Sequence, residues 1–97
     1  MMIKIFSVFD KKASAFMSPF YFNNIPEALR AFDDICNDVN SRINKHPGDY
    51  ALYLLGSFDD KSGEIRPEAK PLFVEDASAM VVVVRPMNID GLVVKEA

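Results

Sequence analysis

The sequence lacks tryptophan, and it holds only one cysteine, one histidine and four glycines among 97 residues. Cys36 cannot form an internal disulfide, and no second cysteine or paired histidine is available to complete a zinc site with it. We therefore expect no metal and no cofactor, and we expect a reducing compartment such as the cytoplasm.

Long apolar runs and catalytic motifs are also missing. The longest apolar run, Ala79–Val84, is far shorter than the roughly 20 residues that a membrane helix needs. The opening Met1–Lys4 segment lacks the apolar core of a signal peptide. There is no glycine-rich phosphate loop and no serine nucleophile elbow. These absences predict no membrane partner and favour a binding or regulatory protein over an enzyme.

Charge is small overall but uneven along the chain. The net charge of −3 argues against a protein that coats nucleic acid through bulk electrostatics, because cationic side chains supply most non-specific affinity for phosphates. Residues 1–24 carry three lysines against one aspartate, whereas residues 25–39 carry one arginine against four carboxylates. Any nucleic-acid site should therefore be local.

The first 22 residues predict a β-hairpin. Residues 2–9 are rich in β-branched and aromatic types, and the short Asp10–Ala13 segment separates them from a second aromatic run, Ala15–Phe22. Ser18-Pro19 interrupts that run, and proline has no backbone donor for a sheet ladder. The second strand should therefore be bent there or lie at a sheet edge.

The next segment predicts the main helix, over residues 25–38. Asn24 can cap it, Pro26 suits its first turn, and Glu27 stands three residues after the cap. Apolar residues at helical spacing predict one buried stripe, formed by Ile25, Ala28, Leu29, Phe32, Ile35, Cys36 and Val39. A frayed end or a second short helix reaches to Lys45, and His46–Asp49 stops it.

The second half predicts another hairpin. Tyr50–Phe58 is a strand, the polar Asp59–Gly63 is its turn, and Glu64–Arg66 returns antiparallel. Pro67 and Pro71 interrupt the return before two further apolar segments, Leu72–Val74 and Ala77–Val84.

The fold class that follows is α+β, in β-β-α-β-β order. A small antiparallel sheet of about four or five strands carries one main helix on one face. Residues 1–81 form a single domain, and residues 82–97 form a C-terminal extension. Its Leu92–Val94 is apolar enough to dock as an added strand, on its own sheet or on that of a second copy.

Several segments together resemble one family. They are Lys4–Ala13, Ala28–Phe32, Asn37-Asp38, Asn40-Ser41, His46–Tyr50, and Leu52–Asp60 with Gly63. On these residues the chain resembles, over positions 3–81, the small non-structural protein of gokushoviruses, which are microviruses with single-stranded DNA. The resemblance implies a phage protein of the host cytoplasm that binds DNA in genome replication or in the switch to packaging. It supplies no catalytic motif, and residues 82–97 lie beyond it.

The residues themselves offer a local site for single-stranded DNA, in which bases stack on aromatic rings and cations follow the backbone. The cations and the exposed ring expected there are Lys4, Lys11, Lys12 and Tyr21, with Phe16, Phe20 and Phe22 beside them. Arg42, Lys45 and His46 form a second cationic patch. The competing interpretation is that these rings fill the core and that the lysines belong to a solvated turn.

Other candidate chemistry has a simpler structural explanation. Asp59 and Asp60, with Asp49 and Glu64, carry the carboxylates that Mg²⁺ prefers, but the segment also has the composition of a hairpin turn. His46 has no partner nearby in sequence to make it a base. Cys36 lies on the apolar stripe and should be an inert core thiol.

The rival function is a homodimeric interaction module without direct DNA binding. A chain this small that is 11% aromatic, with an apolar extension, could hide surplus apolar surface against a second copy. Phage or host replication proteins are the other expected partners. The two functions differ in whether Lys11, Lys12 and Tyr21 are exposed and adjacent.

Overall fold

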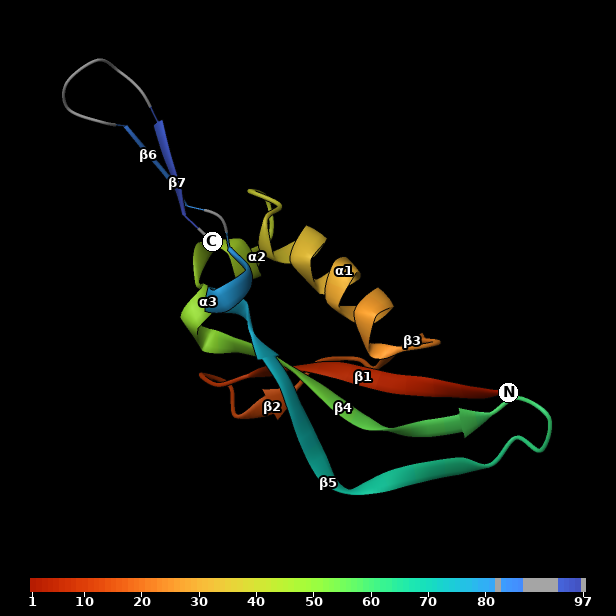
Figure 1. Ribbon diagram of the computed structural model, residues 1–97. Coiled ribbons are helices and arrows are strands. Elements are labelled where there is room, and N and C mark those ends of the chain that lie inside the picture. Colours follow the sequence, from red (N-terminus) through yellow and green to blue (C-terminus); the bar gives the residue numbers. More distant parts are fainter. Residues whose placement is uncertain (82, 87–92, 97) are drawn as a thin grey trace.

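The computed structural model describes residues 1–81, 83–86 and 93–96 (Figure 1). In chain order the elements are β1 (Met2–Asp10), β2 (Ala15–Phe16), β3 (Phe20–Phe22), α1 (Ile25–Cys36), α2 (Arg42–Lys45), a 3₁₀ turn (Pro47–Asp49), β4 (Tyr50–Asp59), β5 (Ile65–Asp76), α3 (Ala77–Met80), β6 (Val83–Pro86) and β7 (Val93–Glu96). Strands β1–β5 form one antiparallel sheet with α1 packed on it, so the predicted α+β class is confirmed. No helix in the described ranges is long and apolar enough to cross a membrane.

The predicted first hairpin is present, but its second strand is divided in two. The turn is held by Asp10, whose Oδ1 accepts hydrogen bonds from Lys12 N at 3.0 Å and Ala13 N at 3.1 Å. Beyond the turn, β2 pairs with the end of β1, and β3 pairs with Lys4–Phe6 on the same edge.

Ser7 stabilises the interruption between β2 and β3. Its side chain is fully buried, and its Oγ donates to the carbonyl oxygen of Met17 at 2.6 Å. The backbone N–H of Met17 bonds the carbonyl of Val8 at 2.8 Å, after which the chain leaves the ladder until Phe20. Pro19 has no N–H to donate to the sheet, so the edge strand gives up the fewest backbone hydrogen bonds by leaving β1 at this point. The expected bend and the expected edge position are both found.

Helix α1 begins as the sequence predicts, since Asn24 Oδ1 accepts a hydrogen bond from Glu27 N at 2.9 Å. It ends at Cys36, two residues earlier than predicted, and the separate α2 carries the chain to Lys45. Two members of the predicted buried stripe are wrong, because Ile35 is 43% exposed and Val39 is 72% exposed. Ile35 lies on the flank of the helix, and Val39 lies beyond its end.

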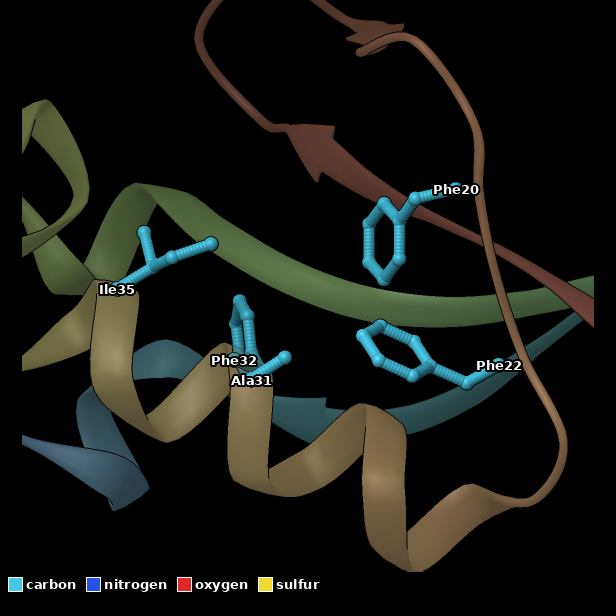
Figure 2. Close-up of a pocket in the computed structure, with 5 residues that line it drawn as sticks. All are labelled: Phe20, Phe22, Ala31, Phe32 and Ile35. Atoms are coloured by element: carbon cyan, nitrogen blue, oxygen red, sulfur yellow. The ribbon is translucent and has the colours of Figure 1, made fainter.

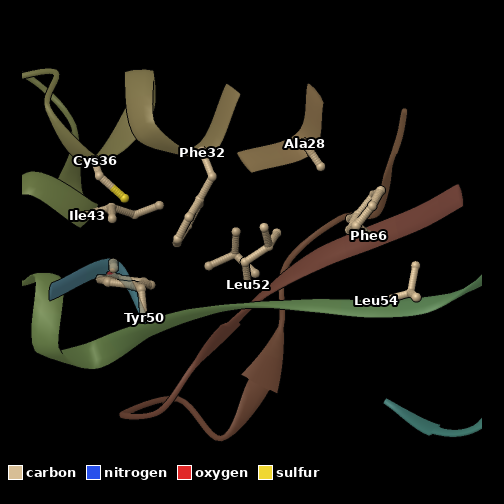
Figure 3. Close-up of a cluster of buried hydrophobic side chains, with 10 residues drawn as sticks. Phe6, Ala28, Phe32, Cys36, Ile43, Tyr50, Leu52 and Leu54 are labelled. Carbon is tan, nitrogen blue, oxygen red and sulfur yellow. The ribbon is translucent and has the colours of Figure 1, made fainter. Parts of the chain in front are cut away.

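The core lies between α1 and the strands β1 and β4 (Figure 3). Phe6 and Leu52 rise from the sheet, and Phe32 and Cys36 descend from the helix; all four are essentially inaccessible to solvent. Burying each large side chain contributes roughly 1.5–3 kcal/mol. This layer therefore holds the helix on one face of the sheet.

The second hairpin is also confirmed, with a longer return strand than predicted. Asp59 N bonds the carbonyl of Glu64 at 2.9 Å, and Gly63 adopts a φ of 77°, which favours glycine. β5 then runs as one edge strand from Ile65 to Asp76, although its pairing with β4 is interrupted between Pro67 and Leu72. An edge position tolerates prolines, because an N–H missing on the outer side breaks no ladder.

The C-terminal part contains a short helix and a separate hairpin. The predicted apolar segment 77–84 begins with α3, which is capped by Asp76 Oδ1 accepting from Ser78 N at 3.0 Å. β6 and β7 pair with each other in a sheet of their own. Of the predicted added strand, Leu92 lies outside the described residues, and Val93 and Val94 belong to β7 rather than to the main sheet.

The two faces of the main sheet have different surroundings. Helix α1 lies over one face, and no other element of the described residues lies against the opposite face (Figure 1). We call these the covered face and the open face. Because side chains alternate along a strand, the register decides which residues reach each one.

Candidate nucleic-acid interface on the open face

Four aromatic rings from four strands meet on the open face. The register puts Phe9 of β1 opposite Phe16 of β2, and Tyr53 of β4 opposite Phe73 of β5. The ring centroids are 4.9 Å apart for Phe9 and Phe16, 5.5 Å for Phe16 and Tyr53, and 5.9 Å for Tyr53 and Phe73. These are tilted and edge-to-face contacts, the geometry that aromatic pairs prefer. We call these four residues the aromatic cluster.

The aromatic cluster remains accessible to solvent. Phe16 is 41% exposed and Phe73 is 58% exposed, although each contacts Tyr53. Ser7 and Ala51, which the register puts on the same side, are 0% and 1% exposed, so the rings shield part of the sheet while the outer sides of Phe16 and Phe73 stay accessible. Contiguous exposed apolar surface of this kind marks interaction sites in soluble proteins.

A shallow apolar hollow lies at the other end of the open face. Ile3, Phe58 and Ile65 stand side by side across β1, β4 and β5, and Tyr21 of β3 completes the lining. The hollow has a volume of about 260 Å³, and Tyr21 and Ile65 are 55% and 62% exposed. Tyr21 is thus the predicted site residue that the structure places on the open face.

The predicted lysines of the first turn have different surroundings. Lys11 Nζ donates to Asp76 Oδ2 at 2.6 Å and to the carbonyl of Gly48 at 3.0 Å, so it fastens the turn to the start of α3. Lys12 is exposed and forms no ion pair within the described ranges. It lies in the turn between β1 and β2, three residues after Phe9 in sequence.

The other predicted cations lie elsewhere. Lys4 is paired with Phe22 in the register, on the covered side, whereas Tyr21 is paired with Ile5 and points to the open side. Arg42 and Lys45 belong to α2, near α3 and away from β3 (Figure 1). Tyr21 lies opposite Ile5, and Ile5 is six residues before Lys11, which is about 20 Å of extended strand. The predicted residues are therefore exposed or partly exposed but do not form one patch.

Two acidic groups near the aromatic cluster in sequence or register, Asp10 and Asp76, have hydrogen-bond partners in the fold. Asp10 uses Oδ1 to hold the turn, and Asp76 is paired with Lys11. Partial burial of Asp76 disfavours its charge, but hydrogen bonds from Lys11 and Ser78 outweigh that effect and lower its pKa below the ordinary value. Lys12 and Lys70, each within three residues in sequence of a cluster member, are exposed and form no ion pair in the described part of the chain.

The carboxylates that were considered as a magnesium site have structural roles. Asp59 Oδ1 accepts from Lys61 N at 2.9 Å, and this backbone hydrogen bond is the main cause of the lowered pKa of Asp59. Asp60 pairs with the N-terminal amine at 2.7 Å. No three metal-binding side chains gather in the part of the chain that the structure describes. The turn interpretation of Asp59-Asp60 is confirmed.

Cys36 is the inert thiol that the sequence predicts. It is the last residue of α1 and is fully buried in the core, and this desolvation raises its pKa to about 12. A thiol with that pKa is almost entirely protonated at neutral pH and is a poor nucleophile.

Comparison with known families assigns the chain. A family model described as Phage ORF5 protein matches residues 3–80. The chain belongs to the phage ORF5 protein family. Apart from Met2, the first residue of β1, the match covers the five strands of the main sheet, so both faces of that sheet lie within the ORF5 region, whereas β6 and β7 lie outside it. The comparisons with curated proteins and with solved structures gave no significant match.

Three members of the aromatic cluster in this ORF5-family protein were absent from the predicted site, namely Phe9, Tyr53 and Phe73. The position of Phe9 could have been predicted from the sequence, because a turn over residues 11–14 sets Phe9 opposite Phe16. Phe73 could not be placed from sequence, since its register depends on the irregularity that Pro67 and Pro71 introduce into β5. Phe20 and Phe22, which were predicted beside the site, pack instead against the covered-face core.

Proposed function

We propose that this phage ORF5-family protein binds single-stranded DNA on the open face of its sheet and acts in replication or packaging of a microvirus genome. The observation that carries the proposal is the aromatic cluster, with exposed rings on a sheet face that no described element covers. The protein acts by binding alone: it holds or redirects a DNA strand, and it makes or breaks no covalent bond.

Stacking explains why an exposed aromatic sheet suits a single strand. Every base has a flat face that can lie on an aromatic ring, and each stacked base contributes roughly 1–3 kcal/mol. Duplex DNA keeps its bases stacked on one another and cannot use the rings in this way. Exposed sheet aromatics are likewise the means by which one common RNA-binding fold holds unpaired bases. Phe16 and Phe73 are the more exposed rings and are the expected stacking platforms.

Electrostatics should then contribute less than stacking. The net charge is −3, and Lys12 and Lys70 are the exposed lysines without an ion pair that lie within three residues of Phe9 and Phe73. Each phosphate contact on a single strand adds about −0.7 to the slope of log affinity against log salt. Two such contacts predict a slope of about −1 to −2, which is shallow for a DNA-binding protein.

The test is fluorescence anisotropy of a labelled 12-nucleotide single strand and of the matching duplex, at low and at physiological salt. The expected result is preference for the single strand, with the shallow salt slope given above. Phe73→Ala should weaken binding about 5- to 150-fold, the equivalent of one stacked base.

Val39→Ala is the matched control, because Val39 is 72% exposed and lies beyond the end of α1. It should leave the affinity unchanged. Binding lost equally in both variants, or a preference for duplex DNA, would contradict stacking on the open face. If loss of affinity follows Arg42→Ala and Lys45→Ala but not Phe73→Ala, the α2 patch is the site instead.

A homodimer on the same face is the second candidate, favoured by the mainly apolar hollow of Ile3, Phe58 and Ile65 with Tyr21. Two sheets packed through such faces would bury these residues. Sedimentation velocity across a hundredfold concentration range separates the two functions. The homodimer predicts a concentration-dependent dimer that Ile65→Lys dissociates; single-strand binding by a monomer predicts no such species.

A further inference from the structure

A second apolar surface lies on the other side of the molecule, between β3 and α1 (Figure 2). Phe20 and Phe22 of β3 face Ala31, Phe32 and Ile35 of the helix across a groove of about 300 Å³. This volume is at the lower end of the range for ligand pockets. The groove is separate from the open face, because Phe20 pairs with Phe6 on the covered side of β1. We call it the edge groove.

The edge groove has an apolar floor with an exposed wall. Phe32 is 1% exposed and belongs to the core, whereas Ile35 is 43% exposed although it follows only three residues later. Ala31 is the smallest residue of the lining and leaves the space that a larger side chain would fill. A single apolar side chain entering from outside would thus contact two phenylalanine rings and Ile35.

The rim of the edge groove along α1 is acidic. Glu27 and Asp34 are exposed and lie four before and three after Ala31, which puts them on its side of the helix. Neither forms an ion pair in the described part of the chain. Arg30 is the one cationic residue of α1, so the acidic residues of the helix outnumber it. Asp38 extends the acidic row past the helix end, whereas Lys4, opposite Phe22 in the register on the covered side, is a cation beside the β3 wall, so the acidic rim is the one along α1.

We propose that the edge groove docks a basic amphipathic peptide segment of another protein, with one aliphatic or aromatic anchor seated over Ala31. Lysine or arginine residues flanking the anchor would face Glu27 and Asp34, and a cation near the anchor would be attracted to the phenylalanine faces. An apolar stripe that inserts into a groove while charges match at the rim is a recurrent mode of peptide recognition.

Charge argues against the other occupants. If two copies packed α1 against α1 through this groove, the carboxylates of both rims would meet, and like charges across an interface are unfavourable. Nucleic acid is excluded by the same carboxylates, which repel phosphates. A basic peptide is the occupant that the apolar floor and the acidic rim both favour.

The test uses a fluorescein-labelled 14-residue probe with leucines at helical spacing and lysines elsewhere, titrated into the full chain and followed by anisotropy. Two companion probes are a scrambled peptide of the same composition, which has no apolar stripe, and a version with glutamate in place of each lysine. The expected result is saturable binding of the first probe only. Binding of the scrambled or the acidic probe with equal affinity would overturn the proposal.

Ala31→Gln and Val39→Gln form a matched pair of variants that leave the net charge unchanged. Ala31→Gln fills the groove and should weaken binding of the probe at least about tenfold, as occlusion of an anchor pocket does. Val39→Gln should leave it within about twofold. Glu27→Gln with Asp34→Asn should weaken binding and flatten its salt dependence. Equal effects of Ala31→Gln and Val39→Gln would overturn the proposal.

The outcome is independent of the proposed function, because Phe73→Ala on the open face should not change binding of the peptide probe. Sedimentation of the unliganded chain supplies the last check. A dimer that Ala31→Gln converts to a monomer would overturn the proposal, since a second copy would then occupy the edge groove.

Discussion

The covered and open faces of the sheet are built from neighbouring residues of the same strands but have different environments. Leu52 is fully buried under α1, whereas the next residue, Tyr53, joins the aromatic cluster on the open side. The difference arises because α1, with its 12 residues, is the one long helix described, and about 18 Å of helix can cover only one face. Apolar residues of a small sheet can therefore serve the core on one side and recognition on the other.

The largest contrast between the faces should appear in thiol reactivity. The native Cys36 is buried with a pKa near 12, whereas a cysteine introduced by Phe73→Cys would stand at an exposed edge with a pKa near the ordinary 8.5 or so. At pH 8 the native thiol should react with a disulfide reagent at least about 100-fold more slowly, because little of it is thiolate and the buried sulfur is inaccessible to the reagent. Comparable rates in stopped-flow labelling would mean that α1 does not seal the covered face.

Truncating a ring on each face compares their contributions to stability. Phe32→Ala removes a ring that is 1% exposed and should lower the free energy of unfolding by about 3–5 kcal/mol. Phe73→Ala removes a ring that is 58% exposed and should cost less than about 1 kcal/mol. Urea denaturation measures both. Equal losses would show that the aromatic cluster is part of the core.

The contact between β4 and β5 is tested at Gly56. A Cβ added there would stand 2.5 Å from the carbonyl oxygen of Arg66 and 2.9 Å from Cα of Pro67, so β5 would have to move. Gly56→Ala should cost about 1–3 kcal/mol and disturb the open-face position of Ile65. Gly48→Ala is the control, because a Cβ there meets nothing within 4 Å. An unchanged unfolding midpoint for Gly56→Ala would contradict the close approach.

The smallest effect concerns the ion pair that fastens the first turn. Asp76 has a lowered pKa in the folded protein, so its contribution to stability is present above the unfolded value of about 3.9 and is lost as pH falls through the folded value. Lys11→Met should cost at most about 1 kcal/mol at pH 7, since both partners are partly exposed. Below pH 4 the difference between variant and parent should shrink. A difference that grows on acidification would contradict this assignment.

Local signals in the sequence predicted much of the fold. The Asn24 cap, the two hairpin turns and the interruption at Pro19 depend on a few adjacent residues, and each is confirmed. The exposed Ile35 and Val39 could not be predicted in the same way. A helical period identifies an apolar stripe, but where α1 ends and how it lies on the sheet decide which members are buried.

The candidate site was only partly predictable for the same reason. Tyr21 could be placed on an exposed edge from its neighbours, and Lys12 in a turn. The aromatic cluster brings together residues up to 64 positions apart, from Phe9 to Phe73, and its existence depends on three strand registers at once. Lys11 was expected to face a ligand, but it pairs with Asp76, which lies 65 positions away in sequence and could not be identified as its partner from local signals.

The most direct test of the open face is a two-dimensional NMR titration of the labelled chain with a 12-nucleotide single strand. We expect the shift changes to concentrate on the aromatic cluster and on Lys12, with Tyr21 at the far end, while the signals of Phe6, Phe32 and Leu52 on the covered side stay unchanged. Changes confined to α2, or no change at millimolar DNA, would contradict the claim that the open face is the binding surface.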